Sequence, residues 1–153
     1  MEYYKALIQM GKESGGFQHE TSWALARLAE CCLRLGHLKE AVDYAQQCLD
    51  IALKISNKLE YGVAYQVLAE LYVSEEYRDW DKAARYLDES FEALRDAGAE
   101  LDVGRTYLAA ARIARLKGDG NARKLTETAR DIFIARKSRP LREEAEALLS
   151  SLL

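Results

Sequence analysis

The sequence predicts an all-α protein built from an array of helical hairpins. Apolar side chains recur at spacings of three and four through most of the 153 residues, as they do on the buried face of an amphipathic helix. The pattern returns twice at intervals of about forty residues: Leu28 is matched by Leu68, 40 residues on, and Leu68 by Ala110, 42 residues on. The chain has one proline, Pro140, so long stretches lack a helix breaker. A repeat of paired helices is therefore expected.

The first full hairpin, residues 21–56, serves as the template for the others. Its first helix is expected over residues 21–35 and to end at Gly36, because glycine adopts the left-handed conformation at a helix C-terminus at little cost. Its second helix is expected over residues 39–55. Small residues in this second helix allow another helix to approach closely.

Two further hairpins follow the same plan, at residues 60–98 and 102–137. The second hairpin has a longer turn between its helices, because Leu68 and Ala83 are 15 residues apart, whereas Leu28 and Ala41 are 13 apart. The expected helices are 60–73, a helix that begins near Asp81, 102–116 and 121–137.

Shorter segments flank the three hairpins. Residues 1–11 are similar to the segments that close the later hairpins, so we interpret them as a half-repeat, the second helix of a hairpin whose first half is missing. A chain cut from a longer protein is the favoured explanation, and a lone helix that caps the array is the alternative. Residues 12–20, which contain Gly15 and Gly16, are expected to form a loop. Residues 140–153 are expected to form a capping helix with Pro140 in its first turn.

The spacing of large and small residues within each hairpin resembles the tetratricopeptide repeat family. In that family the first helix carries a large residue, a leucine, a small residue and an aromatic, followed by a glycine and then by small residues in the second helix. The first hairpin supplies Leu25, Leu28, Ala29, Cys32, Gly36, Ala41 and Cys48. The period of about forty is longer than the family's usual 34 or so. The family's proline after the second helix is absent between hairpins.

This resemblance implies a fold, a function and a site. The fold is a single domain over residues 1–153, a right-handed superhelix of stacked hairpins. The function is non-catalytic: a protein–protein interaction scaffold that holds a partner peptide in a concave groove. The positions that line this groove in the family correspond here to Trp23, Ala26, Arg27, Glu30, Leu33, Arg34, Val63, Gln66, Val67, Glu70, Val73, Arg105, Leu108, Arg112 and Arg115.

Charge along the chain gives one clue to the partner. Residues 1–100 carry 11 basic and 18 acidic side chains, whereas residues 101–142 carry 11 basic and 4 acidic ones. Arg105, Arg112 and Arg115 are spaced to share a helix face, which would suit an acidic peptide, although a solvated helix face has the same pattern. Trp23, Val63 and Val67 are the expected apolar anchors of the peptide.

Other classes of function find little support in the sequence. Glu30 and Glu70 occupy equivalent positions, but no nucleophile or histidine accompanies them, and no phosphate-binding glycine loop is present. We expect no cofactor, metal site or nucleic-acid partner. No apolar run is long enough to span a membrane. The three cysteines, Cys31, Cys32 and Cys48, are expected to be reduced and buried, which fits a cytoplasmic protein.

One alternative function remains open. The half-repeat of residues 1–11 would expose apolar surface, so the chain could be a regulatory or self-association segment of a larger signalling protein. Longer repeats of this kind resemble those in bacterial regulators, cyclases and ATPases. Formation of a homo-oligomer through the half-repeat belongs to this alternative.

Overall fold

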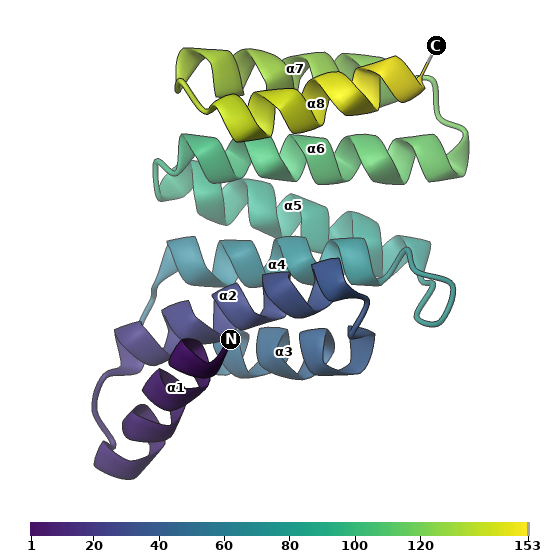
Figure 1. The fold of residues 1–153 in the computed structure, drawn as a ribbon. Coiled ribbons are helices and arrows are strands. Elements are labelled where there is room, and N and C mark those ends of the chain that lie inside the picture. The colour runs from purple at the N-terminus through teal and green to yellow at the C-terminus, as the bar shows by residue number, and fades with distance from the viewer. Residues whose placement is uncertain (153) are drawn as a thin grey trace. The chain divides into compact units, whose positions relative to one another are not determined.

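The computed structural model is entirely helical in the part of the chain that it describes, residues 1–152, which form eight α-helices and no strand (Figure 1). The all-α prediction is confirmed, and adjacent helices pack as in a tetratricopeptide-like helical repeat. The helices are α1 (Glu2–Ser14), α2 (Gln18–Leu35), α3 (Leu38–Lys54), α4 (Lys58–Leu71), α5 (Trp80–Asp96), α6 (Glu100–Lys117), α7 (Ala122–Ala135) and α8 (Arg139–Ser151).

The loop expected over residues 12–20 is wrong in extent. Helix α1 continues to Ser14 and α2 already begins at Gln18, so the connection has three residues. Gly15 ends α1 with a φ of 64°, and Phe17 precedes α2 with a φ of 57°, both in the left-handed region. Residues 12–14 and 18–20 contain no helix breaker, so the chain stays helical up to the two residues that reverse it.

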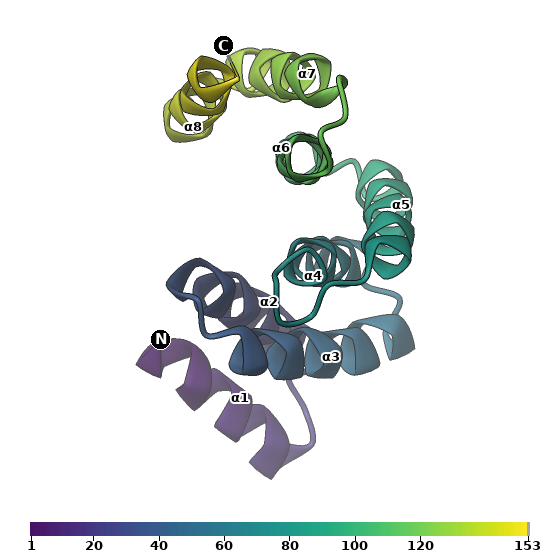
Figure 2. The same cartoon turned by 90° about the vertical axis from the view of Figure 1, so that its right-hand side faces the viewer.

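The chain divides into two compact units, Met1–Ala93 and Leu94–Leu153, with the boundary inside α5. In the first unit α2 packs against α1, α3 and α4, and α3 also packs against α4 (Figure 2). The core residues Leu25, Leu28 and Leu68 are almost fully buried there. The single domain and the right-handed superhelix stay predictions.

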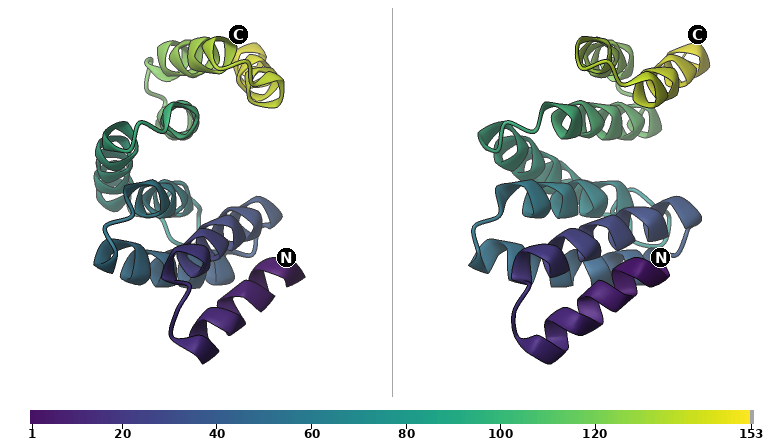
Figure 3. Two further views of the ribbon diagram at one scale, coloured as in Figure 1. Left: turned by 90° about the vertical axis from the view of Figure 1, so that its left-hand side faces the viewer. Right: turned by 60° about the vertical axis from the view of Figure 1, so that its left-hand side comes forward.

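A glycine allows α1 to lie close to α2 (Figure 3). A Cβ atom built on Gly11 would stand 2.0 Å from the Thr21 Oγ1. This distance is too short for a non-bonded contact, so a side chain at residue 11 would force one of the two helices to move. Gly11 and Thr21 are both buried. The position of α1 therefore depends on the absence of a side chain at residue 11.

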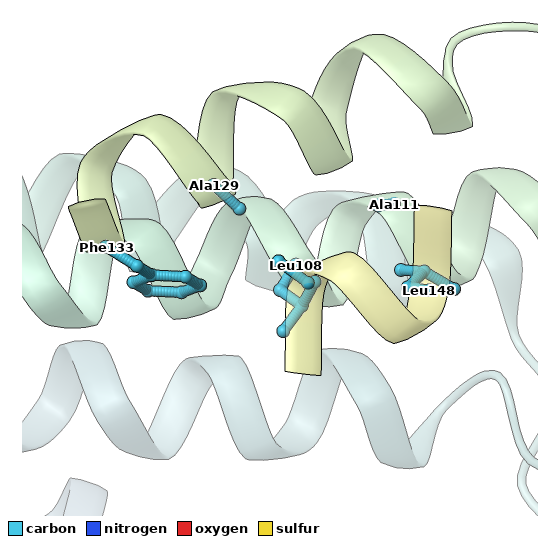
Figure 4. Packing of buried hydrophobic residues seen from close by; sticks show 6 residues of the cluster. Leu108, Ala111, Ala129, Phe133 and Leu148 are labelled. Carbon is cyan, nitrogen blue, oxygen red and sulfur yellow. The ribbon is translucent and has the colours of Figure 1, made fainter. Parts of the chain in front are cut away.

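The second unit has a core of its own between α6, α7 and α8. Figure 4 shows how its buried side chains meet. Phe133 is fully buried, and the half-buried Leu125 and Leu141 pack against the same cluster. The buried members are Leu108, Ala111, Ala129, Phe133, Ala145 and Leu148.

The turns that link one hairpin to the next share a local geometry. Ser56, Gly98 and Lys137 have φ values of 55°, 67° and 55°, and each stands between two helices. The following residue donates its backbone N–H to a carbonyl five residues back: from Asn57 to Ala52 at 2.8 Å, and from Ser138 to Phe133 at 2.9 Å. Gly36 and Gly118, inside hairpins, have the same geometry, so it is a general way in which helices of this chain end.

Candidate functional site

Trp23 is the most accessible apolar residue of the predicted groove. It lies in α2 and is 38% exposed. Its ring packs edge to face against the ring of Tyr4 from α1, with 5.3 Å between the ring centroids. Tyr3 in turn meets Tyr4 at 5.6 Å, and Tyr3 is 66% exposed. These three side chains, Tyr3, Tyr4 and Trp23, form an aromatic patch on the first unit.

Arg27 and Glu30 are held within the protein. The Arg27 guanidinium lies 3.1 Å from the Glu30 carboxylate one turn away and 3.9 Å from the carboxylate of Glu60 in α4. Glu60 is 3% exposed and lies in the first turn of its helix, where the helix dipole favours a negative charge. Arg27 therefore joins α2 to α4. Arg34, near the end of α2, is exposed.

The predicted groove residues of α4 lie mostly in the interior. Val63 and Val67 are 0% and 2% exposed, so a peptide could not reach them without displacing neighbouring helices. Gln66 is buried as well, and Glu70 is half-buried. The expectation that the two valines present an apolar anchor surface is wrong, because both side chains lie in the interior of the first unit.

The predicted groove residues of α6 all have partners inside the second unit. Arg105 lies 3.6 Å from Asp102 in its own helix. Arg112 pairs with Glu144 of α8, and Arg115 donates to the Ser151 Oγ at 3.0 Å. Leu108 is 2% exposed and belongs to the buried cluster with Leu148. The part of this face that carries Leu108, Arg112 and Arg115 was expected to be open and is instead lined by α8.

A comparison with known families gives the first three helices their class. Residues 1–54, which comprise α1, α2 and α3, match the model of the tetratricopeptide repeat family. Residues 1–54 therefore belong to the tetratricopeptide repeat family. A search of curated proteins finds no match to this chain.

The tetratricopeptide positions of the first hairpin agree with this assignment. The small residues Ala29, Ala41 and Cys48 are each 0% exposed, at the close contacts where the repeat requires small side chains. The three cysteines are free thiols. Cys32 and Cys48 are buried as expected, whereas Cys31 is partly exposed, because the buried face of α2 includes Cys32 and turns its neighbour away.

Burial changes the chemistry of Cys48. Its Sγ donates to the backbone oxygen of Ser22 at 3.4 Å and to that of Glu60 at 3.6 Å. Burial, followed by the charge of Glu60, raises the pKa of the Cys48 thiol to about 12. This cysteine is a neutral structural link between the helices of the first unit.

Sequence reasoning missed two features of the second unit. One is the pair of contacts that Glu144 and Ser151 of α8 make with α6. The spacing of Leu141, Ala145 and Leu148 is the signal that could have revealed which face of α8 packs against its neighbours. A pocket of about 270 Å³ also lies beside the turn from α7 to α8. It is lined by Phe133, Ile134, Lys137, Ser138, Arg139 and Arg142.

Residues 1–152 show neither a cluster of metal ligands nor a membrane-spanning helix. Across residues 1–152, no three or more His, Cys, Asp and Glu side chains are grouped as metal ligands would be. Within the same range, no helix combines the length and the apolar character needed to cross a bilayer.

Proposed function

We propose that this protein is a non-catalytic scaffold that binds a peptide segment of a partner at the aromatic patch of Tyr3, Tyr4 and Trp23. Tetratricopeptide repeats generally mediate protein–protein interactions. The observation that carries the proposal is the exposure of Trp23, 38%, at a position that the family uses for its ligand. A cytoplasmic location suits the three free cysteines.

The physical properties of the patch support this role. Tryptophan and tyrosine offer a large contact area, have few rotatable bonds and are enriched among the residues that dominate binding energy. The edge-to-face contact with Tyr4 holds the Trp23 ring in place before a ligand arrives, which reduces the entropy lost on binding. Arg34, exposed on the same helix, could pair with an acidic group of the peptide. The buried valines of α4 have no part in this site.

Tryptophan fluorescence provides a direct test, because the chain has two tryptophans. In a Trp80→Phe variant Trp23 is the remaining tryptophan, so peptides selected from a displayed random library should shift its emission as they bind. Titration calorimetry, which does not depend on the removed reporter, should then show that Trp23→Ala weakens binding of the selected peptides about thirtyfold, the loss of a binding hot spot worth about 2 kcal/mol.

The matched control is Leu53→Ala, which removes a 49% exposed apolar side chain from α3. It should leave the affinity unchanged. Selected peptides that do not alter Trp23 emission, or that lose equal affinity in the two variants, would contradict the proposed site.

Self-association is a second candidate function, as part of a regulatory segment in a larger signalling protein. Tyr3 and Met10 are 66% and 55% exposed and lie seven residues apart, so they share one face of α1. Sedimentation of the wild type should show a concentration-dependent dimer that Tyr3→Ser with Met10→Ser abolishes. A strict monomer at high concentration would remove this candidate.

A further inference from the structure

Helix α8 presents one continuous face to its neighbours. Leu141, Glu144, Ala145, Leu148 and Ser151 are spaced by three, one, three and three residues, which places them on a single stripe of the helix. Ala145 and Leu148 are buried, and Leu141 is half-buried against the same cluster. This is the pattern by which an amphipathic helix docks in a groove of another protein.

The surface that receives α8 is complementary to that stripe in shape and charge. Its floor is apolar and is built from Leu108 and Ala111 of α6 and from Ala129 and Phe133 of α7 (Figure 4). Beside this floor, Arg112 pairs with the Glu144 carboxylate, and Arg115 donates to the Ser151 hydroxyl at 3.0 Å. We call the six residues from α6 and α7 the α8 socket: Leu108, Ala111, Arg112, Arg115, Ala129 and Phe133.

From this geometry we infer that the α8 socket recognises acidic amphipathic helices, that α8 is its intramolecular occupant, and that a partner helix with a similar stripe replaces α8. The inference rests on the proposed scaffold function and names a partner class for a second surface. The partner helix is expected to carry a leucine, a glutamate three residues later and a second leucine four residues after that, as α8 does with Leu141, Glu144 and Leu148.

The way α8 is held is compatible with replacement. Of its thirteen residues, all within the described chain, two are buried. The opposite side carries the exposed residues Glu143, Glu146 and Ala147, so it forms no second core. The Arg112–Glu144 pair is partly open to water, with exposed side-chain fractions of 34% and 41%, and can therefore exchange partners without a large desolvation cost.

Reversing the charge of Glu144 should open the socket without touching the core. The probe is a fluorescently labelled synthetic peptide with the sequence of residues 139–152. A Glu144→Arg chain repels its own α8 from Arg112 while the socket keeps its basic side chains, so it should bind the peptide about tenfold more tightly than the wild type does, because the free socket is more populated. Glu143→Arg is the matched control: Glu143 is exposed and pairs with Arg139 of α8 itself, so this variant should bind like the wild type.

A charge swap tests where the peptide sits. An Arg112→Glu chain should reject the wild-type peptide and bind a peptide in which Glu144 is replaced by arginine. Hydrogen exchange should show faster exchange in α8 and unchanged exchange in α3 when the wild-type peptide is added to the wild-type chain. Circular dichroism checks that each variant keeps its helix content.

Equal binding by the Glu144→Arg and Glu143→Arg chains would overturn the inference. So would failure of the swapped peptide to bind the Arg112→Glu chain, or peptide binding that leaves exchange in α8 unchanged. These outcomes are independent of the Trp23 experiment, which concerns the other unit. Loss of the α8 inference alone leaves the scaffold proposal standing, and absence of Trp23-dependent binding removes the proposed site whatever the peptide does.

Discussion

Gly104 of α6 lies directly against the ring of Phe133 of α7. A Cβ atom built on Gly104 would stand 2.6 Å from the Phe133 Cε1 and 3.0 Å from the Ile132 Cγ2. Phe133 is fully buried, and its ring is confined by the cluster shared by α6, α7 and α8. The distance between α6 and α7 is therefore set by the missing side chain at residue 104.

We expect Gly104→Ala to destabilise the protein. The added methyl group must displace a buried ring that has little room to move, and overpacking of this kind costs about 1–3 kcal/mol. Urea denaturation measures the loss of the free energy of unfolding. Gly120→Ala is the control, because nothing lies within 4 Å of a Cβ there. Equal stability of the two variants would show that Phe133 is not confined.

The left-handed turns between hairpins offer a gain in stability. Ser56 and Lys137 have φ values of 55°, a conformation that costs a residue with a Cβ about 1 kcal/mol and costs glycine little. Lys137→Gly should therefore raise the free energy of unfolding by about 0.5–1 kcal/mol, as measured by thermal or urea unfolding. Gly98→Ala, at the equivalent turn, should lower it by a similar amount. Changes of the same sign in both variants would contradict the shared geometry.

The contact between Arg27 and Glu60 predicts a cost for removing the cation. Arg27→Met would leave a carboxylate that is 3% exposed without the Arg27 guanidinium, and breaking such a pair costs about 3 kcal/mol. Adding Glu60→Gln should recover part of that loss, because the buried charge is then gone. Arg34→Met, at an exposed position of the same helix, should change stability little. A loss no greater than that of Arg34→Met would show that the pair contributes nothing.

The Cys48 thiol predicts a dependence of stability on alkaline pH. Its pKa is about 12 in the folded chain and about 9.0 in an ordinary setting, so the folded state retains a proton that the unfolded state releases. The stabilisation of the folded state by the protonated Cys48 thiol is complete below pH 9 and is lost as the pH rises toward 12. Between about pH 8.5 and 10.5, stability should fall more steeply in the wild type than in Cys48→Ala, by about 1–2 kcal/mol. Parallel pH profiles would mean that the thiol does not titrate as proposed.

Thiol labelling separates the same cysteines by accessibility. Cys31 is partly exposed, whereas Cys48 is buried and its sulfur is hydrogen-bonded to two backbone oxygens. Under native conditions at pH 8, a maleimide should modify Cys31 first and should reach Cys48 after unfolding. Peptide mass spectrometry after timed quenching gives the order.

Much of the helical plan was predictable from local pattern. Gly36 ends α2 with a φ of 77°, as predicted, and Gly118 ends α6 in the same way with a φ of 70°. The predicted helices end within a few residues of those observed, because amphipathic spacing and helix-stopping glycines act over one or two turns. The loop at residues 12–20 was predicted too long, because two glycines indicate a turn without defining its limits.

The candidate site was less predictable than the helices. Trp23, one of the family's groove positions, is 38% exposed, but Val63 and Leu108, which the same frame assigns to the groove, are buried. The accessibility of a helix position depends on which helix packs beside it, and that helix is distant in sequence. Nothing in the sequence distinguishes Glu144 from the other glutamates of α8, and only its tertiary contact reveals the pair with Arg112.

The sequence by itself determined that this protein is an all-helical repeat, because a helix is specified by spacings of three and four and a hairpin by the residues that interrupt them. The tertiary structure decided which side chains remain available: it buried the valines of α4, joined Arg27 to Glu60, and placed α8 beside the arginines of α6. The physical reason is that burial and ion pairing arise between helices, where residues far apart in the chain compete for the same surface.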